Sequence, residues 1–443
     1  MPRTAEIIAV GNELLTGGVT NTNARFLSEL LTAAGVDVLY HTAVGDDEGR
    51  LEAAVTAARQ RAELLVCTGG LGPTYDDMTK TAVCAALDTP LVFHPDIVPD
   101  IRRYFDTVFH REMPACNLRQ AYLPQDCTVF RNPVGTAPGC AFTAGGVTAV
   151  LLPGVPSECR YLAEHCLLPY LERLHGQVIR SHDLRIFGLT EPQVQELLND
   201  LLHQEEDLTL APYADTGEVS LHLSARAADD AACEARMAPL LAEVRRRLGS
   251  YLYGTDVSGL EETALRLCQA RGLTLSAAES CTGGLIAQRL TSVSGSSEVF
   301  GYGFVTYWEQ AKAKLVGVDP AVIEKYNVVS APVAAQMALG AAKASGADIA
   351  VSVTGLAGPT GGDEVRPVGT VYLGAARDGV ACVKKLFVSR PDRALVRARA
   401  AQAALELALR LAQGKVPAGT QALTAAQQSD DEALAALDEA FVR

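Results

Sequence analysis

Three polar side chains in the C-terminal part of the chain have the types expected of a hydrolytic nucleophile and its base: Ser280, Tyr307 and Lys312. A serine whose proton is taken by a lysine can attack a carbonyl carbon. Lysine acts as such a base only if burial or nearby cations lower its pKa from about 10 toward neutrality. We predict Ser280 as the nucleophile and Lys312 as the base, with Tyr307 relaying the proton or orienting the amine.

The element that must position Ser280 is a turn from a strand into a helix. Small, apolar residues predict a buried strand at 273–278, and a helix is predicted at 285–291. The first N–H groups of a helix lack partners within it, and the helix dipole makes this end positive. The N–H groups of Thr282, Gly283 and Gly284 are therefore a candidate oxyanion hole or phosphate site.

Each of these side chains also has an ordinary interpretation. Ser280 can cap the backbone, Lys312 can be a surface lysine and Tyr307 can pack at a strand edge. Cys281 is the rival nucleophile, because a thiolate is intrinsically more reactive than a hydroxyl. All eight histidines precede residue 223, so a Cys/His pair within the C-terminal region is excluded.

Further substrate contacts are expected from a glycine-rich loop at 353–362, which lies between two predicted strands. Glycines at this density indicate a backbone that approaches a ligand or another subunit closely. Arg393 and Arg397 are spaced i,i+4 on the last predicted helix of the domain, where they can clamp a phosphate; solvated surface arginines are the alternative. The loop residues expected to contact substrate are Thr354, Gly355 and Gly358.

The N-terminal region alternates short apolar runs with helical segments, which predicts a parallel sheet with crossover helices. Ligands in such sheets bind beyond the carboxyl ends of the strands, where the glycine-rich turns 11–18 and 69–72 fall. The loop at 131–139 is a candidate wall of this first site.

Two carboxylates at a predicted helix start, Asp76 and Asp77, can hold a divalent metal, although aspartate is also an ordinary helix cap. The motif itself indicates a site for an anionic, nucleotide-sized ligand. Its predicted residues are Glu13, Asn23, Gly69, Gly70, Gly72, Asp76, Asp77 and Thr79.

Four segments of the C-terminal region, ESCTGG, GFVTYWEQAK, VTGLAGPTGG and PVGTVY, resemble the C-terminal domain of the CinA family. That resemblance implies nicotinamide-nucleotide amidohydrolase activity, the deamidation of nicotinamide mononucleotide (NMN), with no cofactor at the amidase site. The segment TGGLGPTYDDMTK resembles the loop of the molybdopterin-binding, MoaB/MogA-like fold. In CinA-family proteins this domain is associated with metal-dependent ADP-ribose pyrophosphatase activity, with the metal implied at Asp76 and Asp77.

The segment 181–254 predicts a small α+β unit and resembles the KH-like middle domain of longer CinA proteins. It has no GxxG loop joining two helices, and its basic cluster is limited to 245–247. Three arginines near a helix C-terminus are more typical of surface charge than of a nucleic-acid patch. We expect an architectural or dimerisation role, and a homodimer.

The predicted fold class is α/β, with a small α+β domain in the middle, and the chain is divided into four segments. Residues 1–176 form a MoaB/MogA-like three-layer domain, 177–254 the KH-like domain and 255–414 a three-layer amidohydrolase domain. Residues 415–443 are expected to be a flexible tail because of their Pro, Gly and Gln content, with a short amphipathic helix at 430–442 as the alternative.

Composition limits the classes of function. With 443 residues, 48% of them hydrophobic, the chain can bury several cores. Its formal charge of −14 argues against direct nucleic-acid binding. Eleven scattered cysteines without a CxxC motif fit reduced thiols, and no apolar run reaches the roughly 18 residues of a membrane span. We expect a cytoplasmic protein whose partners are small nucleotides, not membranes.

The sequence therefore predicts a bifunctional enzyme, an NMN deamidase with a metal-dependent ADP-ribose pyrophosphatase domain. Two alternatives stay open. In one, the N-terminal domain only binds a pterin or nucleotide and regulates the other half. In the other, the protein is a competence or recombination adaptor.

Overall fold

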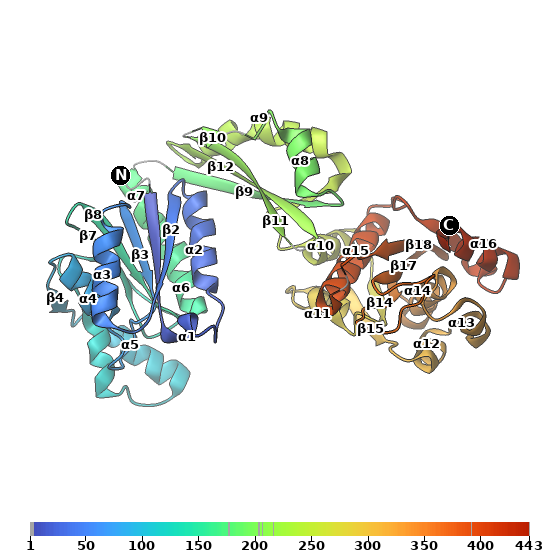
Figure 1. The fold of residues 1–443 in the computed structure, drawn as a ribbon, viewed down its shortest axis with the longest axis horizontal. Coiled ribbons are helices and arrows are strands. Elements are labelled where there is room, and N and C mark those ends of the chain that lie inside the picture. Colours follow the sequence, from blue (N-terminus) through green and yellow to red (C-terminus); the bar gives the residue numbers. More distant parts are fainter. Residues whose placement is uncertain are drawn as a thin grey trace. The chain divides into compact units, whose positions relative to one another are not determined.

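A computed structural model describes residues 4–175, 178–202, 204–205, 207–215, 217–390 and 392–442. Three main β-sheets with their covering helices succeed one another along the chain, as Figure 1 shows. The predicted boundary at residues 176 and 177 lies outside the described residues.

The N-terminal domain is built on a six-stranded sheet in the order β2-β1-β3-β8-β7-β6. Strand β1 runs parallel to β2 and β3, and β3 runs parallel to β8, whereas β7 is antiparallel to β8 and β6. The strands are β1 (Thr4–Val10), β2 (Asp37–Val44), β3 (Leu64–Thr68), β6 (Thr128–Phe130), β7 (Gly139–Ala144) and β8 (Val147–Leu152), with β4 (Leu91–Phe93) and β5 (Tyr122–Pro124) forming a separate pair.

Alternating residues of β1 enter two separate cores, which makes this domain a three-layer structure. Ile7 packs with α2 and α6 on one face, and Ile8 packs with α3 and α4 on the other. The helices are α1 (Asn12–Leu15), α2 (Thr22–Ala33), α3 (Glu48–Ala58), α4 (Thr79–Ala86), α5 (Val98–Tyr104), α6 (Pro156–Leu162) and α7 (Leu168–His175), with the π-helices η1 (Phe105–Phe109) and η3 (Ala163–Leu167) and the 3-10 helix η2 (Ala115–Ala121).

The middle domain is the predicted α+β unit, a five-stranded sheet in the order β10-β11-β12-β9-β13. Its alternation is confirmed, because Val219, Leu221 and Leu223 of β12 are all buried. The elements are β9 (Val178–Phe187), α8 (Glu191–Leu198), β10 (Gln204–Glu205), β11 (Leu208–Asp215), β12 (Glu218–Ala227), α9 (Asp230–Leu248), η4 (Gly249–Tyr251) and β13 (Leu252–Thr255).

The C-terminal domain has a second six-stranded sheet, ordered β15-β14-β16-β17-β18-β19. Strand β14 runs parallel to both β15 and β16, and the remaining pairs are antiparallel. The strands are β14 (Leu275–Glu279), β15 (Phe300–Val305), β16 (Ile349–Gly355), β17 (Thr370–Arg377), β18 (Val380–Phe387) and β19 (Gln421–Thr424).

Helices cover both faces of this sheet, so the predicted three-layer α/β architecture is confirmed. One core contains residues of α10 (Leu260–Arg271), α11 (Leu285–Thr291) and α15 (Arg393–Ala412). The other contains residues of α12 (Glu309–Val316), α13 (Pro320–Tyr326), α14 (Ala331–Ser345) and α16 (Asp431–Val442). Short 3-10 turns, η5 (Ser296–Glu298) and η6 (Ala425–Gln427), complete the domain.

The expectation of a flexible tail at 415–443 is wrong for the residues that the structure describes. Strand β19 pairs antiparallel with β18, and Leu423 faces Ala381 in this register. Leu434 and Leu437 of α16 are buried in the second core. The reason is tertiary: β18 would otherwise be an open sheet edge, and the segment supplies both the missing strand and a covering helix.

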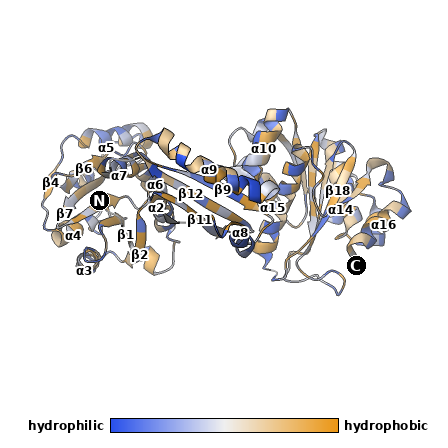
Figure 2. Cartoon of the chain, turned by 90° about the horizontal axis from the view of Figure 1, so that it is seen from above, coloured by the Kyte–Doolittle hydropathy of each residue, from blue (hydrophilic) through white to orange (hydrophobic). Residues whose placement is uncertain are grey.

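Within the described part of the chain, no helix combines the length and the apolar character that crossing a bilayer requires. Figure 2 shows hydrophobic and hydrophilic residues along the same helices, such as α9.

Candidate active site

The structure brings Ser280 and Lys312 into direct contact. Ser280 directly follows β14, and Lys312 lies in the first turn of α12, which comes after the neighbouring strand β15. The Lys312 Nζ is 3.1 Å from the Ser280 Oγ and donates a hydrogen bond of 2.8 Å to the carbonyl of Thr306. A nucleophile and a base at this distance can exchange a proton.

Lys312 is almost completely buried, with only 1% of its surface exposed. Burial lowers the pKa of Lys312 to about 8, because the charged ammonium loses its hydration; the nearby Glu309 and Cys281 act in the opposite direction. At this pKa, roughly a tenth of the amine is neutral at pH 7. Lys312 therefore meets the condition stated above for a lysine base, namely that burial lowers its pKa.

A cavity of about 620 Å³ opens over this pair. Eight of the predicted residues line it: Ser280, Cys281, Tyr307, Lys312, Thr354, Gly355, Gly358 and Arg393. Trp308, Glu309 and Gln310 also line the cavity, and sequence reasoning did not single them out as site residues. Four predicted residues are not among the described lining: Thr282, Gly283, Gly284 and Arg397.

The helix start that was expected to form an oxyanion hole is already occupied by a carboxylate. Glu279 is buried and accepts hydrogen bonds from the N–H groups of Gly284 (3.0 Å), Ile286 (3.0 Å) and Ala287 (2.9 Å). The Gly283 N–H is bonded to the Ser280 carbonyl at 3.0 Å. The prediction is therefore wrong for both glycines, because the Gly284 N–H serves the buried acid and the Gly283 N–H serves the Ser280 carbonyl.

Of the three predicted donors, the Thr282 N–H is the one for which no hydrogen bond is found among the described residues. Sequence reasoning missed Glu279. Its signal was an acidic residue at the end of an apolar strand, just before a helix start, where a carboxylate is favoured by the helix dipole.

The two arginines predicted to clamp a phosphate have separate roles. Arg393 faces the cavity, where it donates to the Gly358 carbonyl (2.8 Å) and to the Tyr307 hydroxyl (2.9 Å). Arg397 donates to the carbonyls of Cys281 (3.2 Å) and Thr282 (2.7 Å) and so holds the turn after Ser280. Only Arg393 is placed to meet a substrate.

Cys281 fits the rival role poorly. Burial raises the pKa of its thiol to about 11, so the thiol stays protonated near neutral pH. Since the thiolate is the reactive form of cysteine, this environment disfavours Cys281 as a nucleophile.

A second candidate site is a cavity of about 760 Å³ at the carboxyl ends of β1, β3 and β8. Asn23 is fixed there by hydrogen bonds to the Gly154 carbonyl (2.8 Å) and the Thr68 hydroxyl (3.2 Å). The predicted residues that line it are Glu13, Asn23, Gly70, Gly72 and Asp77. Gly69 supports the turn, since a Cβ there would lie 2.2 Å from the Val10 carbonyl oxygen.

Asp76 and Asp77 do not fit the predicted metal site. Asp77 accepts hydrogen bonds from the N–H groups of Gly72 and Thr74, both at 2.8 Å, and Asp76 is exposed and outside the described lining of the cavity. No group of three or more His, Cys, Asp or Glu side chains placed to hold a metal occurs in the described ranges. The alternative of a helix cap is also wrong for Asp77, because α4 begins after Met78 without a side-chain cap and Asp77 binds N–H groups of the preceding loop instead. Thr79 is likewise structural, since it donates to the Gly69 carbonyl at 2.8 Å.

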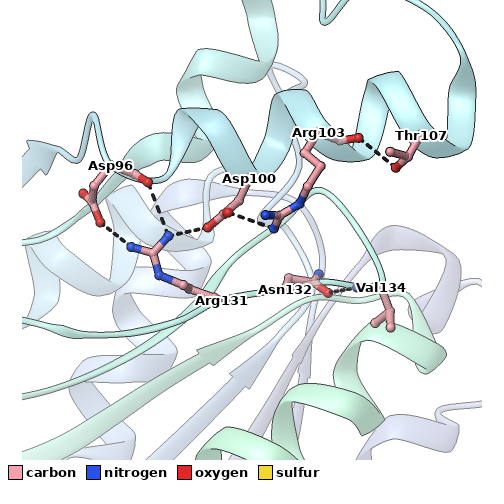
Figure 3. Close-up of polar contacts among 7 residues, drawn as sticks. All are labelled: Asp96, Asp100, Arg103, Thr107, Arg131, Asn132 and Val134. Carbon is pink, nitrogen blue, oxygen red and sulfur yellow. Dashed lines mark hydrogen bonds and ion pairs between the residues drawn. The ribbon is translucent and has the colours of Figure 1, made fainter.

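The loop at 131–139 is a wall of this cavity, as predicted, because Thr136 and Ala137 line it. Figure 3 shows how it is held: Arg131 binds Asp96 at 2.8 Å and also Asp100, and Asn132 accepts from the Val134 N–H at 3.1 Å. Asn132 also donates to the Glu158 carboxylate at 2.6 Å. Burial raises the pKa of Glu158, which makes this cavity residue a candidate acid or base that sequence reasoning did not assign.

Family models match three segments of the chain. Residues 257–412 match the "CinA C-terminal domain", residues 6–173 the "Probable molybdopterin binding domain" and residues 181–254 the "Damage-inducible protein CinA KH domain". These matches agree with the three folded domains expected from the sequence.

Relatives with similar sequences span almost the whole chain. A CinA-like protein from Kosmotoga olearia is 43% identical over 408 residues, which cover 92% of this chain and 98% of the relative. A relative from Caldicellulosiruptor saccharolyticus, named as a competence-damage inducible protein, is 42% identical over 405 residues, 91% of this chain and 98% of its own. The crystal structure of the competence/damage inducible protein CihA from Agrobacterium tumefaciens is 42% identical, covers 34% of this chain and 94% of its own, and has a TM-score of 0.33. With its three domain matches and these relatives, the chain belongs to the CinA family.

Proposed function

We propose that the C-terminal domain hydrolyses the carboxamide of nicotinamide mononucleotide, releasing ammonia and nicotinic acid mononucleotide. The observation that carries this proposal is the contact of 3.1 Å between the Lys312 Nζ and the Ser280 Oγ beneath a cavity of about 620 Å³. A cavity of this size can take a mononucleotide. The choice of the nicotinamide carboxamide as the substrate amide comes from the resemblance of the surrounding segments to the amidohydrolase domain of the family.

The proposed reaction has two steps that share one base. The neutral amine of Lys312 takes the proton of Ser280 as its oxygen attacks the amide carbon. The resulting ammonium returns that proton to the amide nitrogen, the C–N bond breaks and ammonia leaves an acyl ester on Ser280. Lys312 then deprotonates a water that cleaves the ester, which restores Ser280 and releases the carboxylate.

Other lining residues can orient this substrate. Arg393 lines the cavity beside Tyr307, so its guanidinium is the proposed partner of the substrate's phosphate. Trp308 also lines the cavity and is 74% exposed, which leaves its indole face available to stack on a pyridine ring.

The test is ammonia release from NMN by the full chain and by three variants. Ser280→Ala and Lys312→Ala should each lower kcat by about a thousandfold or more, because each removes a group that takes part in bond making. Cys281→Ala is the matched control at the neighbouring position and should keep most of the activity. Activity that survives in Ser280→Ala but is lost in Cys281→Ala would reverse the assignment of the nucleophile.

For the N-terminal domain we propose binding and hydrolysis of a nucleotide diphosphate such as ADP-ribose. The supporting observation is the cavity of about 760 Å³, where glycine-rich backbone, Asn23 and the half-buried carboxyl of Glu158 meet. No step is assigned to a metal, since Asp76 and Asp77 do not offer its ligands. The test is AMP formation from ADP-ribose by the Ser280→Ala protein, in which the proposed amidase is inactive. AMP formation by this protein, and the loss of AMP formation in Glu158→Gln, would support hydrolysis. Binding without turnover would favour the regulatory role, and no binding would favour the adaptor.

A further inference from the structure

A second large cavity of the C-terminal domain lies directly beside the Ser280 cavity. It measures about 900 Å³, and Glu309, Gln310 and Val328 line both cavities, so the two share a wall. Small-molecule sites typically measure about 300 to 1,000 Å³. The second cavity is therefore large enough for a ligand of its own, or for part of a ligand that continues from the first.

Three cationic side chains line this second cavity: Lys314, Lys325 and Arg366. Lys314 is exposed, and no ion pair of its ammonium is found in the described part of the domain. Lys325 is paired with Asp431 at 3.0 Å but keeps half of its side chain exposed. The acidic residues Glu309 and Glu324 also line the cavity, and Asp431 neutralises Lys325. Lys314 and Arg366 are therefore the lining cations for which no ion pair is found among the described residues.

Arg366 is the most informative of the three, because part of its guanidinium lacks a partner. Its Nη2 donates to the Tyr326 carbonyl at 2.9 Å, which fixes the side chain on the cavity wall. Its Nε is buried and has no hydrogen-bond acceptor among the described residues. The Nε is shielded from the cavity, whereas the Nη1 is not among the buried atoms and no hydrogen bond of it is found in the described residues. The Nη1 is therefore the donor that an anion in the cavity can reach.

The rest of the wall suits a planar, weakly polar group. Pro320, Ile323 and Ala313 contribute apolar surface, and Tyr326 is buried beside them. Guanidinium and ammonium groups next to such a surface match a phosphate joined to an aromatic ring system.

We propose that this second cavity binds a phosphorylated nucleotide group, with its phosphate at Arg366 and Lys314. That group comes either from a separate nucleotide bound beside the substrate or from the second half of a dinucleotide whose first half lies over Ser280. Binding does not depend on turnover at Ser280, so it is measurable whether or not the proposed amidase activity exists.

The experiment is calorimetric titration of the full-length Ser280→Ala protein. In one titration AMP is added to protein that has been saturated with NMN, and in the other NAD is added to protein without NMN. Arg366→Gln and Lys314→Gln should each weaken the binding of AMP or NAD roughly tenfold, because each removes a charged hydrogen bond to phosphate. Lys343→Gln, an exposed lysine of α14, is the matched control and should leave binding unchanged.

The outcomes distinguish the two sources. AMP that binds NMN-saturated protein and is weakened by Arg366→Gln supports a separate nucleotide. NAD that competes with NMN, and is weakened by the same substitution, supports an extended substrate. Unchanged affinities for both ligands in Arg366→Gln and Lys314→Gln, with thermal unfolding intact, overturn the proposal, as does the absence of any binding.

Discussion

At the scale of single residues, the proposed chemistry depends on one buried amine. Lys312 has no carboxylate within hydrogen-bonding distance among its described contacts, which are the Ser280 hydroxyl and the Thr306 carbonyl. A carbonyl and a hydroxyl stabilise an ammonium less than an ion pair would, so desolvation dominates and the neutral amine becomes accessible.

This environment predicts the pH dependence of NMN hydrolysis. Since the pKa of Lys312 is lowered to about 8, kcat/KM should rise with pH through about 8 and then level off as the neutral amine becomes dominant. The measurement is the pH profile of ammonia release by the wild-type protein. If kcat/KM did not change between roughly pH 6 and pH 9, Lys312 would be excluded as the base.

The same shift has a consequence for stability. The lysine titrates near its ordinary value of 10.5 in the unfolded chain but near 8 in the folded one, so between these values the unfolded state binds more protons. The free energy of unfolding should therefore gain a contribution as pH rises from about 8 to 10.5, and Lys312→Met should remove that contribution.

At the scale of elements, the turn between β14 and α11 is stabilised by Glu279, whose carboxylate accepts from three N–H groups of the helix start. Arg397 holds the same turn from the α15 side through two carbonyls. Together these contacts fix the backbone of the turn and thereby position the Ser280 side chain.

We expect Glu279→Gln to destabilise the domain by about 1 to 3 kcal/mol, because a neutral amide replaces a buried acceptor of charged hydrogen bonds. Unfolding in urea measures the change, and kcat for NMN should fall with it as Ser280 loses its position. Glu432→Gln, an exposed acid on α16, serves as control. Equal stability of the two variants would contradict this role of Glu279.

The C-terminal strand and helix are a second element with a specific expectation. Leu434 and Leu437 are 1% and 5% exposed, so Leu434→Ala and Leu437→Ala should each cost about 2 to 5 kcal/mol of unfolding free energy. Ala436→Ser, at an exposed position of the same helix, should cost little. Deletion of 415–443 should lower both stability and amidase activity, since it opens the β18 edge; unchanged unfolding after deletion would restore the flexible-tail interpretation.

At the scale of the whole molecule, each three-layer domain carries its cavity at the carboxyl ends of parallel strands. The N-terminal cavity follows β1, β3 and β8, and the C-terminal cavity follows β14, β15 and β16. At these edges the strands end together and loops of different sequence converge, so polar groups far apart in the chain meet.

Because each domain has its own cores, damage to one site should spare the other. Gly70 has a φ of +64°, and a Cβ there would lie 2.2 Å from the Thr79 hydroxyl. Gly70→Ala should therefore destabilise the N-terminal domain by roughly 1 to 3 kcal/mol and abolish ligand binding there, with NMN hydrolysis unchanged. Parallel loss of both activities would show that the sites are coupled.

The amino-acid sequence by itself determined the α/β class, the order of the three folded domains, and eight of the residues that line the cavity at Ser280. These features follow from local periodicity and from strand ends that a parallel sheet must bring together. Only the tertiary structure decided that Glu279 occupies the helix start, that Arg397 holds the turn instead of a phosphate, and that the last segment completes the sheet. The first two depend on which group takes up the free hydrogen-bonding groups of the turn, and the third depends on which sheet edge lacks a partner strand. These contacts join residues far apart in the chain, so the local sequence does not reveal them.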